Sequence, residues 1–237
     1  MKPLKHSVFA ALAAFAALGA LALSGAMPAG AQAPTPQERV AALKANLATS
    51  QTLLKQYEWI EVTILSLKGE EKSRTEFRCY WGADGKVQKV PVGTTPSTDK
   101  KRGLRGKIVE NKKGELSEYM DNAVELVKSY IPPDPARIEA VKSAGKMSFT
   151  PAGSRMRIDF ADYQKPGDKL SVELDMAQNT LLGLTVDTWL KDAKDVIGMK
   201  ASFGSLTDGA TYPAEITLSA PSQKLDVKMT NSGYKKM

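Results

Sequence analysis

The chain has 237 residues and carries 33 Lys and Arg against 26 Asp and Glu, a formal net charge of +7. It contains a single histidine, His6, and a single cysteine, Cys79. One thiol excludes an intramolecular disulfide, and without histidine beyond His6 there is neither an imidazole base for a Ser or Cys nucleophile nor a His/Cys metal site. We therefore expect a protein that is not an enzyme and has no catalytic residues, metal or cofactor.

Residues 1–31 have the layout of a secretory signal peptide. A basic start is followed by an uncharged apolar run over 8–23, and small residues then lead to an A-x-A cleavage pattern ending at Ala31. The apolar run is shorter than the ~20 residues that a membrane-spanning helix needs. The sequence predicts export to the periplasm or medium, cleavage after Ala31, and one soluble domain over 32–237.

In the first part of that domain, the sequence predicts one helix and three antiparallel strands. Apolar residues at helical spacing indicate an amphipathic helix over 36–57. Alternating residues then predict strands over 58–66, 74–81 and 86–92. Asp84-Gly85 is a hairpin dipeptide between the last two strands. Cys79 lies within the second strand, where we expect a small buried side chain rather than a reactive thiol.

Residues 93–113 contain few apolar side chains and many turn formers, and we expect a loop. This segment holds seven cations, which are Lys100, Lys101, Arg102, Arg105, Lys107, Lys112 and Lys113. They are either a docking strip for acidic partners, such as an anionic membrane surface, or an ordinary solvated loop. Nucleic acid is not an expected partner, because no aromatic residues stand between the cations to stack on bases.

Helices are expected next, over 115–131 and 134–144. Asp134 and Pro135 form a typical helix start, and Gly145 a typical end. Period-two strands follow over 147–150, 155–163, 169–176, 180–190, 196–203, 212–219 and 224–230. Their short links predict antiparallel pairing. The fold class is α+β: a large curved antiparallel sheet, a half-barrel of about nine strands, with the N-terminal helix and the two mid-chain helices covering its concave face.

This order of elements resembles the bacterial outer-membrane lipoprotein carrier (LolA-like) superfamily. The local likeness rests on the Leu-Leu-Gly-Leu-Thr run at 181–185, Phe-Gly-Ser-Leu at 203–206, Asp208-Gly209, and Tyr212-Pro213 opening the next strand. The basic loop and helices at 93–145 match that family only in position. The resemblance implies an apolar cavity for a lipid or for the acyl chains of lipoproteins, and hence a non-catalytic binding protein.

The cavity would be lined by inward apolar side chains from the strands. The candidates are Trp59, Phe77, Trp81, Ile158, Phe160, Leu184, Trp189 and Phe203. For each of them the alternative is an ordinary place in a packed core. Two other functions stay open: an envelope interaction module that docks acidic partners through residues 100–113, and a hydrolase. The hydrolase needs two carboxylates about 5–9 Å apart in a cleft, with Asp159, Asp162, Glu173 and Asp175 available on the strands.

Overall fold

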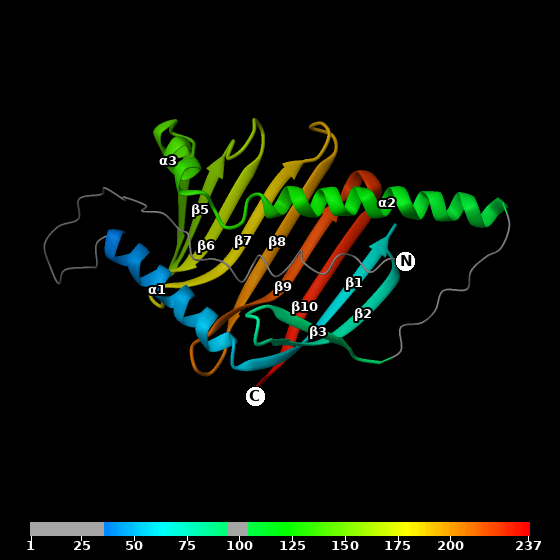
Figure 1. The fold of residues 1–237 in the computed structure, drawn as a ribbon. Helices are drawn as coiled ribbons and strands as arrows, with labels where there is room; N and C mark the ends of the chain where they lie inside the picture. The colour runs from blue at the N-terminus through cyan, green and yellow to red at the C-terminus, as the bar shows by residue number, and fades with distance from the viewer. Residues whose placement is uncertain (1–35, 94–103) are drawn as a thin grey trace, which may run out of the picture.

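The computed structural model describes residues 36–93 and 104–237. In these ranges a single antiparallel sheet has ten strands in the order β3-β2-β1-β10-β9-β8-β7-β6-β5-β4. Three α-helices accompany it, and α1 and α2 cross the same face of the strands (Figure 1). The sheet is open and curved, so the α+β half-barrel prediction is confirmed, with ten strands instead of about nine. The proposed signal peptide lies outside the described residues.

The strands follow the predicted segments closely. Their bounds are β1 Tyr57–Leu67, β2 Glu70–Trp81, β3 Val87–Pro91, β4 Met147–Ala152, β5 Arg155–Ala161, β6 Lys169–Asp175, β7 Thr180–Trp189, β8 Val196–Ser205, β9 Thr211–Ala220 and β10 Leu225–Lys236. The largest difference is β10, which continues six residues past the predicted end at 230. This extension pairs with the start of β1, so that Tyr57 lies opposite Lys236.

Pairing of β1 with β10 joins the two meanders into one sheet. Strands β1 to β3 lie in the chain between the first helix and the other two, and β4 to β10 follow all three helices. The join contains a bulge, because Trp59 alone on β1 faces both Gly233 and Tyr234 on β10. Gly233 has a φ of +63°, a conformation that glycine adopts without the steric cost that a Cβ would bring.

The helices span Pro36–Leu54 for α1, Leu104–Lys128 for α2 and Pro135–Ser143 for α3. The side chain of Asp134 caps α3 by accepting a 2.9 Å hydrogen bond from the backbone N of Ala136, as the sequence predicts. The loop prediction for 93–113 is wrong from Leu104 onward, because α2 already begins there. The scarcity of apolar residues and the many turn formers had favoured a loop, but a glycine within a helix, such as Gly106, costs only about 1 kcal/mol relative to alanine.

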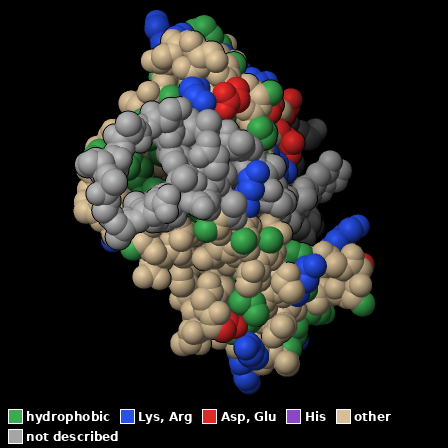
Figure 2. Space-filling model, turned by 90° about the vertical axis from the view of Figure 1, so that its left-hand side faces the viewer, with side chains coloured by type: hydrophobic (Ala, Val, Ile, Leu, Met, Phe, Trp, Pro, Cys, Tyr) green, Lys and Arg blue, Asp and Glu red, His purple; other side chains and the backbone are tan. Residues whose placement is uncertain are grey.

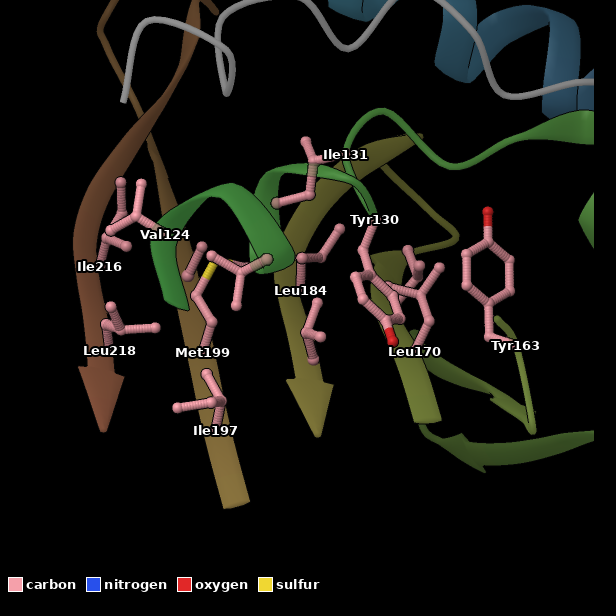
Figure 3. Packing of buried hydrophobic residues seen from close by; sticks show 14 of the residues in the cluster. Val124, Tyr130, Ile131, Tyr163, Leu170, Leu184, Ile197, Met199, Ile216 and Leu218 are labelled. Carbon is pink, nitrogen blue, oxygen red and sulfur yellow. The ribbon is translucent and has the colours of Figure 1, made fainter. Parts of the chain in front are cut away.

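The hydrophobic core lies between the helices and one face of β5 to β10 (Figure 3). Val124 of α2, together with Tyr130 and Ile131 just beyond its end, packs with buried residues of β6 to β9. These residues alternate along each strand, as Ile197 and Met199 do on β8. We call this helix-bearing side of the sheet the inner face and the opposite side the outer face.

Candidate functional site

Three of the predicted cavity residues belong to the packed core. Ile158 and Phe160 on β5 and Leu184 on β7 are at most 4% exposed and are part of the core cluster. Phe203 on β8 is partly buried and packs against the same cluster. Their position on the inner face agrees with the predicted alternation. Because Ile158, Phe160 and Leu184 are buried among other side chains, they are structural residues of the core.

Trp189 has a different environment. It follows Thr188, which is buried with Val186 and Leu184 on the inner face, so alternation places Trp189 on the outer face of β7. The Nζ of Lys165 lies 3.7 Å from the centre of its ring. Its indole Nε1 donates to the carbonyl oxygen of Pro166. Trp189 is therefore separated from the other aromatic candidates by the thickness of the sheet.

The remaining candidates, Trp59, Phe77 and Trp81, lie together on the inner face of β1 and β2. Trp59 shares its side of β1 with Leu65 and Leu67, which pack against the core. Phe77 lies opposite Glu61, and Cys79 opposite Trp59, so Phe77 and Trp81 share that side. All three aromatic rings are only partly buried. This end of the inner face is thus less covered than the core over β5 to β9.

A cluster of tyrosines adjoins these rings, which sequence reasoning missed. Tyr234 of β10 stacks on Trp59, with ring centres 5.6 Å apart and planes 12° from parallel. Its ring is also 4.3 Å from Tyr212 of β9 and 6.3 Å from Tyr57 of β1. Burial raises the pKa of Tyr234 above its ordinary value. The sequence does contain one signal for this cluster. It is Gly233, because a glycine followed by an aromatic residue near a strand end is consistent with a bulge.

An ion pair is buried on the same face. The Nζ of Lys89 on β3 donates to both carboxylate oxygens of Glu61 on β1, at 2.6 and 2.7 Å. The two side chains are 13% and 7% exposed. The bond reaches across β2, where Cys79 lies opposite both Trp59 and Lys89. Since the two charges neutralise each other, this part of the face offers an incoming ligand aromatic surface without net charge.

Cys79 is fully buried, as the sequence predicts. Burial, together with the nearby Glu61 carboxylate, raises the pKa of its thiol to about 12. A thiol with this pKa is almost entirely protonated at neutral pH and is therefore a poor nucleophile.

Three of the four carboxylates considered for hydrolysis are engaged with cations: Asp159, Glu173 and Asp162, the last with Lys146, whereas Asp175 accepts hydrogen bonds from backbone N atoms in the turn after β6. Asp159, on the outer face of β5, accepts hydrogen bonds from Ser171 and from the Nε of Arg157 at 2.9 Å. Glu173 lies 3.8 Å from the same arginine. Burial acts to raise the pKa of Asp159, but the hydrogen bonds from Ser171 and Arg157 outweigh it and lower the pKa. A general acid needs the opposite shift.

The predicted cationic strip lies only partly in the described ranges. Lys100, Lys101 and Arg102 lie outside them, whereas Arg105, Lys107, Lys112 and Lys113 fall on the backbone of α2. Figure 2 views the molecule from the side away from the start of α2, and there positive and negative side chains are both scattered over the described surface. Docking of an acidic partner through this strip stays a prediction.

Within 36–93 and 104–237, no group of three or more His, Cys, Asp or Glu side chains is arranged to hold a metal ion. No helix of this part of the chain is both long and apolar enough to span a membrane.

Comparison with known proteins gives little further information. No family model matches the sequence, and no curated protein matches it. Among solved structures, the chain is similar to a DUF1329 family protein from Desulfovibrio piger, with 8% sequence identity and a TM-score of 0.32. The match covers 83% of this chain and 92% of that one. A TM-score this low does not establish a common fold.

Proposed function

We propose that this protein is a non-catalytic binding protein that holds an apolar ligand, such as the acyl chain of a lipid or lipoprotein, on the inner face of β1 and β2. The observation that carries the proposal is the row of partly buried rings formed by Trp59, Phe77 and Trp81. Large aromatic side chains gathered on one concave surface are typical of small-molecule sites.

The physical driving force would be removal of apolar surface from water. Each buried CH₂ group contributes about 0.8 kcal/mol, so a long acyl chain can offset the cost of association and ordering. The paired charges of Glu61 and Lys89 favour a neutral segment of ligand at this place. A charged group there would have to compete with an ion pair whose hydrogen bonds are already made.

The protonation chemistry of two candidate catalytic groups supports binding without catalysis. The Cys79 thiol is buried with a raised pKa, and the Asp159 carboxylate on the outer face has a lowered one. Neither group has the activation that a nucleophile or a general acid requires.

The test is titration of the protein with a fluorescent fatty acid, followed by displacement with an unlabelled one. We expect saturable binding that Trp59→Ala weakens several-fold. Trp189→Ala is the matched control, since it removes a tryptophan from the outer face and should leave the affinity unchanged. Absence of saturable uptake by the folded wild-type protein would overturn the proposal, as would equal weakening by both substitutions.

A further inference from the structure

The two edges of the sheet differ in how they are protected against further strands. In the described ranges, β3 and β4 are the edge strands, and each is paired on one side only. At the β3 edge, Lys89 places a charge on the inner face in the middle of a strand of five residues. Short edge strands and inward-pointing charges prevent pairing with other chains. The strand β4, Met147–Ala152, contains no charged residue, so a further strand meets no such charge there.

The hydrogen-bond pattern shows which backbone groups of β4 are directed to its free edge. The backbone N of Ala161 donates to the carbonyl oxygen of Lys146 at 2.9 Å, and these residues continue the β4–β5 register by one position. Hydrogen-bonded pairs alternate along an antiparallel ladder. The alternate residues Met147, Phe149 and Pro151 therefore direct their backbone groups away from β5. Pro151 offers only its carbonyl oxygen there, because proline has no backbone N–H.

The same three residues carry the apolar side chains of β4 on the inner face. Phe149 lies opposite Ile158 of β5, which is buried in the core, so the two side chains share the inner face. Ile158 is 4% exposed, whereas Phe149 is 39% exposed. The apolar inner face thus continues to the edge of the sheet, where nothing in the described ranges covers the Phe149 ring completely.

We propose that β4 pairs with β4 of a second copy of this chain, antiparallel about a two-fold axis through Phe149. In this register the two Phe149 residues exchange both of their backbone hydrogen bonds. The N–H of each Met147 donates to the carbonyl oxygen of Pro151 in the other copy. Pro151 therefore lies where its missing N–H removes the fewest hydrogen bonds, and residues 147–151 of both copies are paired.

The side chains of β4 are complementary to themselves in this arrangement. The two-fold axis keeps both inner faces on one side of the joined sheet, where the two Phe149 rings lie opposite each other. On the outer face, Ser148 lies opposite Thr150 of the other copy. Aromatic pairs and Ser/Thr pairs are favourable across neighbouring strands, and no charge is opposed by a like charge. Because both copies use the same edge, the assembly closes at two chains.

The experiment measures the mass of the protein in solution by sedimentation over a range of micromolar concentrations. Wild-type protein should reach the mass of two chains. Phe149→Lys brings two ammonium groups opposite each other, and Phe149→Glu brings two carboxylates together. Each substitution should raise the dissociation constant of the dimer at least about tenfold. An equimolar mixture of the two variants should recover the dimer, because the opposed charges then attract.

Val90→Lys is the matched control. It places a lysine at an exposed valine of the other edge strand, β3, and should leave the mass of two chains unchanged. Thermal unfolding of each variant establishes that it is folded. Recovery of the dimer in the mixture also excludes misfolding as the reason for dissociation of the separate variants.

Four results would overturn the proposal. The first is a wild-type protein that stays monomeric at all concentrations, which would leave the edge to a strand of another protein. The second is a dimer that neither Phe149 substitution weakens. The third is a mixture of the two charged variants that does not recombine. The last is a mass that keeps growing beyond two chains, since that requires contact between unlike edges.

Discussion

Lys89 and Glu61 form a two-hydrogen-bond ion pair that spans the strand between them, with donor–acceptor distances of 2.6 and 2.7 Å. Both side chains are largely removed from solvent. Loss of one partner leaves a buried charge without compensation, whereas replacement of both by apolar groups of similar size is often neutral. The contribution of each side chain to the stability of the fold therefore depends on the presence of the other.

We expect Lys89→Met to lower the free energy of unfolding by about 3–5 kcal/mol. The double substitution Lys89→Met with Glu61→Leu should restore most of that loss. Denaturant unfolding of the single and double variants provides the measurement. A double variant as unstable as the sum of the two single variants would show that the side chains act independently.

The end of α2 is attached to the sheet through Tyr130. Its hydroxyl donates to the buried Asp168 at 2.5 Å, and the backbone N atoms of Gln164 and Lys165 also bind this carboxylate. Tyr130→Phe should cost about 1–3 kcal/mol of unfolding free energy, because Asp168 loses a donor in a buried place. Tyr80→Phe, on the outer face of β2, is the control and should have little effect. Equal stability of wild type and Tyr130→Phe would contradict this account.

Asp208 connects the β8–β9 turn to the end of the β1–β10 pairing at which Tyr57 lies opposite Lys236. It accepts a 2.6 Å hydrogen bond from the Tyr57 hydroxyl and lies 3.2 Å from Lys236 Nζ. The hydrogen bond from Tyr57, assisted by Lys236, lowers the pKa of Asp208.

A carboxylate whose pKa is lower in the folded state stabilises the fold fully above its unfolded pKa, about 3.9. This contribution is lost as pH falls through the folded pKa. Asp208→Asn should therefore flatten the decline of the unfolding midpoint below about pH 4. Unfolding curves recorded between neutral and acid pH test this, and a decline identical to wild type would contradict it.

The thiol of Cys79 should be unreactive in the native protein. It is buried, and its pKa is raised to about 12, so the thiolate is scarce at neutral pH. A thiol-specific reagent should modify one cysteine in denaturant and none in native buffer on the time scale of minutes. Rapid modification of the folded protein would mean that this part of the inner face opens.

Local signals in the sequence predicted most elements correctly. Period-two alternation identified the strands, and Asp134 with Pro135 located the start of α3. The pairing of β1 with β10 was not predictable in this way, because Tyr57 and Lys236 are far apart in the chain and neither strand carries a local sign of its partner. The early start of α2 was missed because few apolar residues and many turn formers suggested a loop over 93–113.

The sequence predicted only part of the candidate site. Alternation put Phe77 and Trp81 on one side of β2. It also put Trp189 on the opposite side of β7 from Leu184, and the prediction of one cavity lined by both residues did not take this into account.

The central claim is that an apolar chain lies along Trp59 on the inner face, and position-sensitive quenching tests it most directly. Two single-tryptophan proteins are needed, one retaining Trp59 and the other Trp189, with phenylalanine at the remaining positions. A fatty acid brominated in mid-chain quenches only a nearby indole. We predict saturable quenching of Trp59 and none of Trp189. Equal quenching of both, or no quenching of either, would contradict the account.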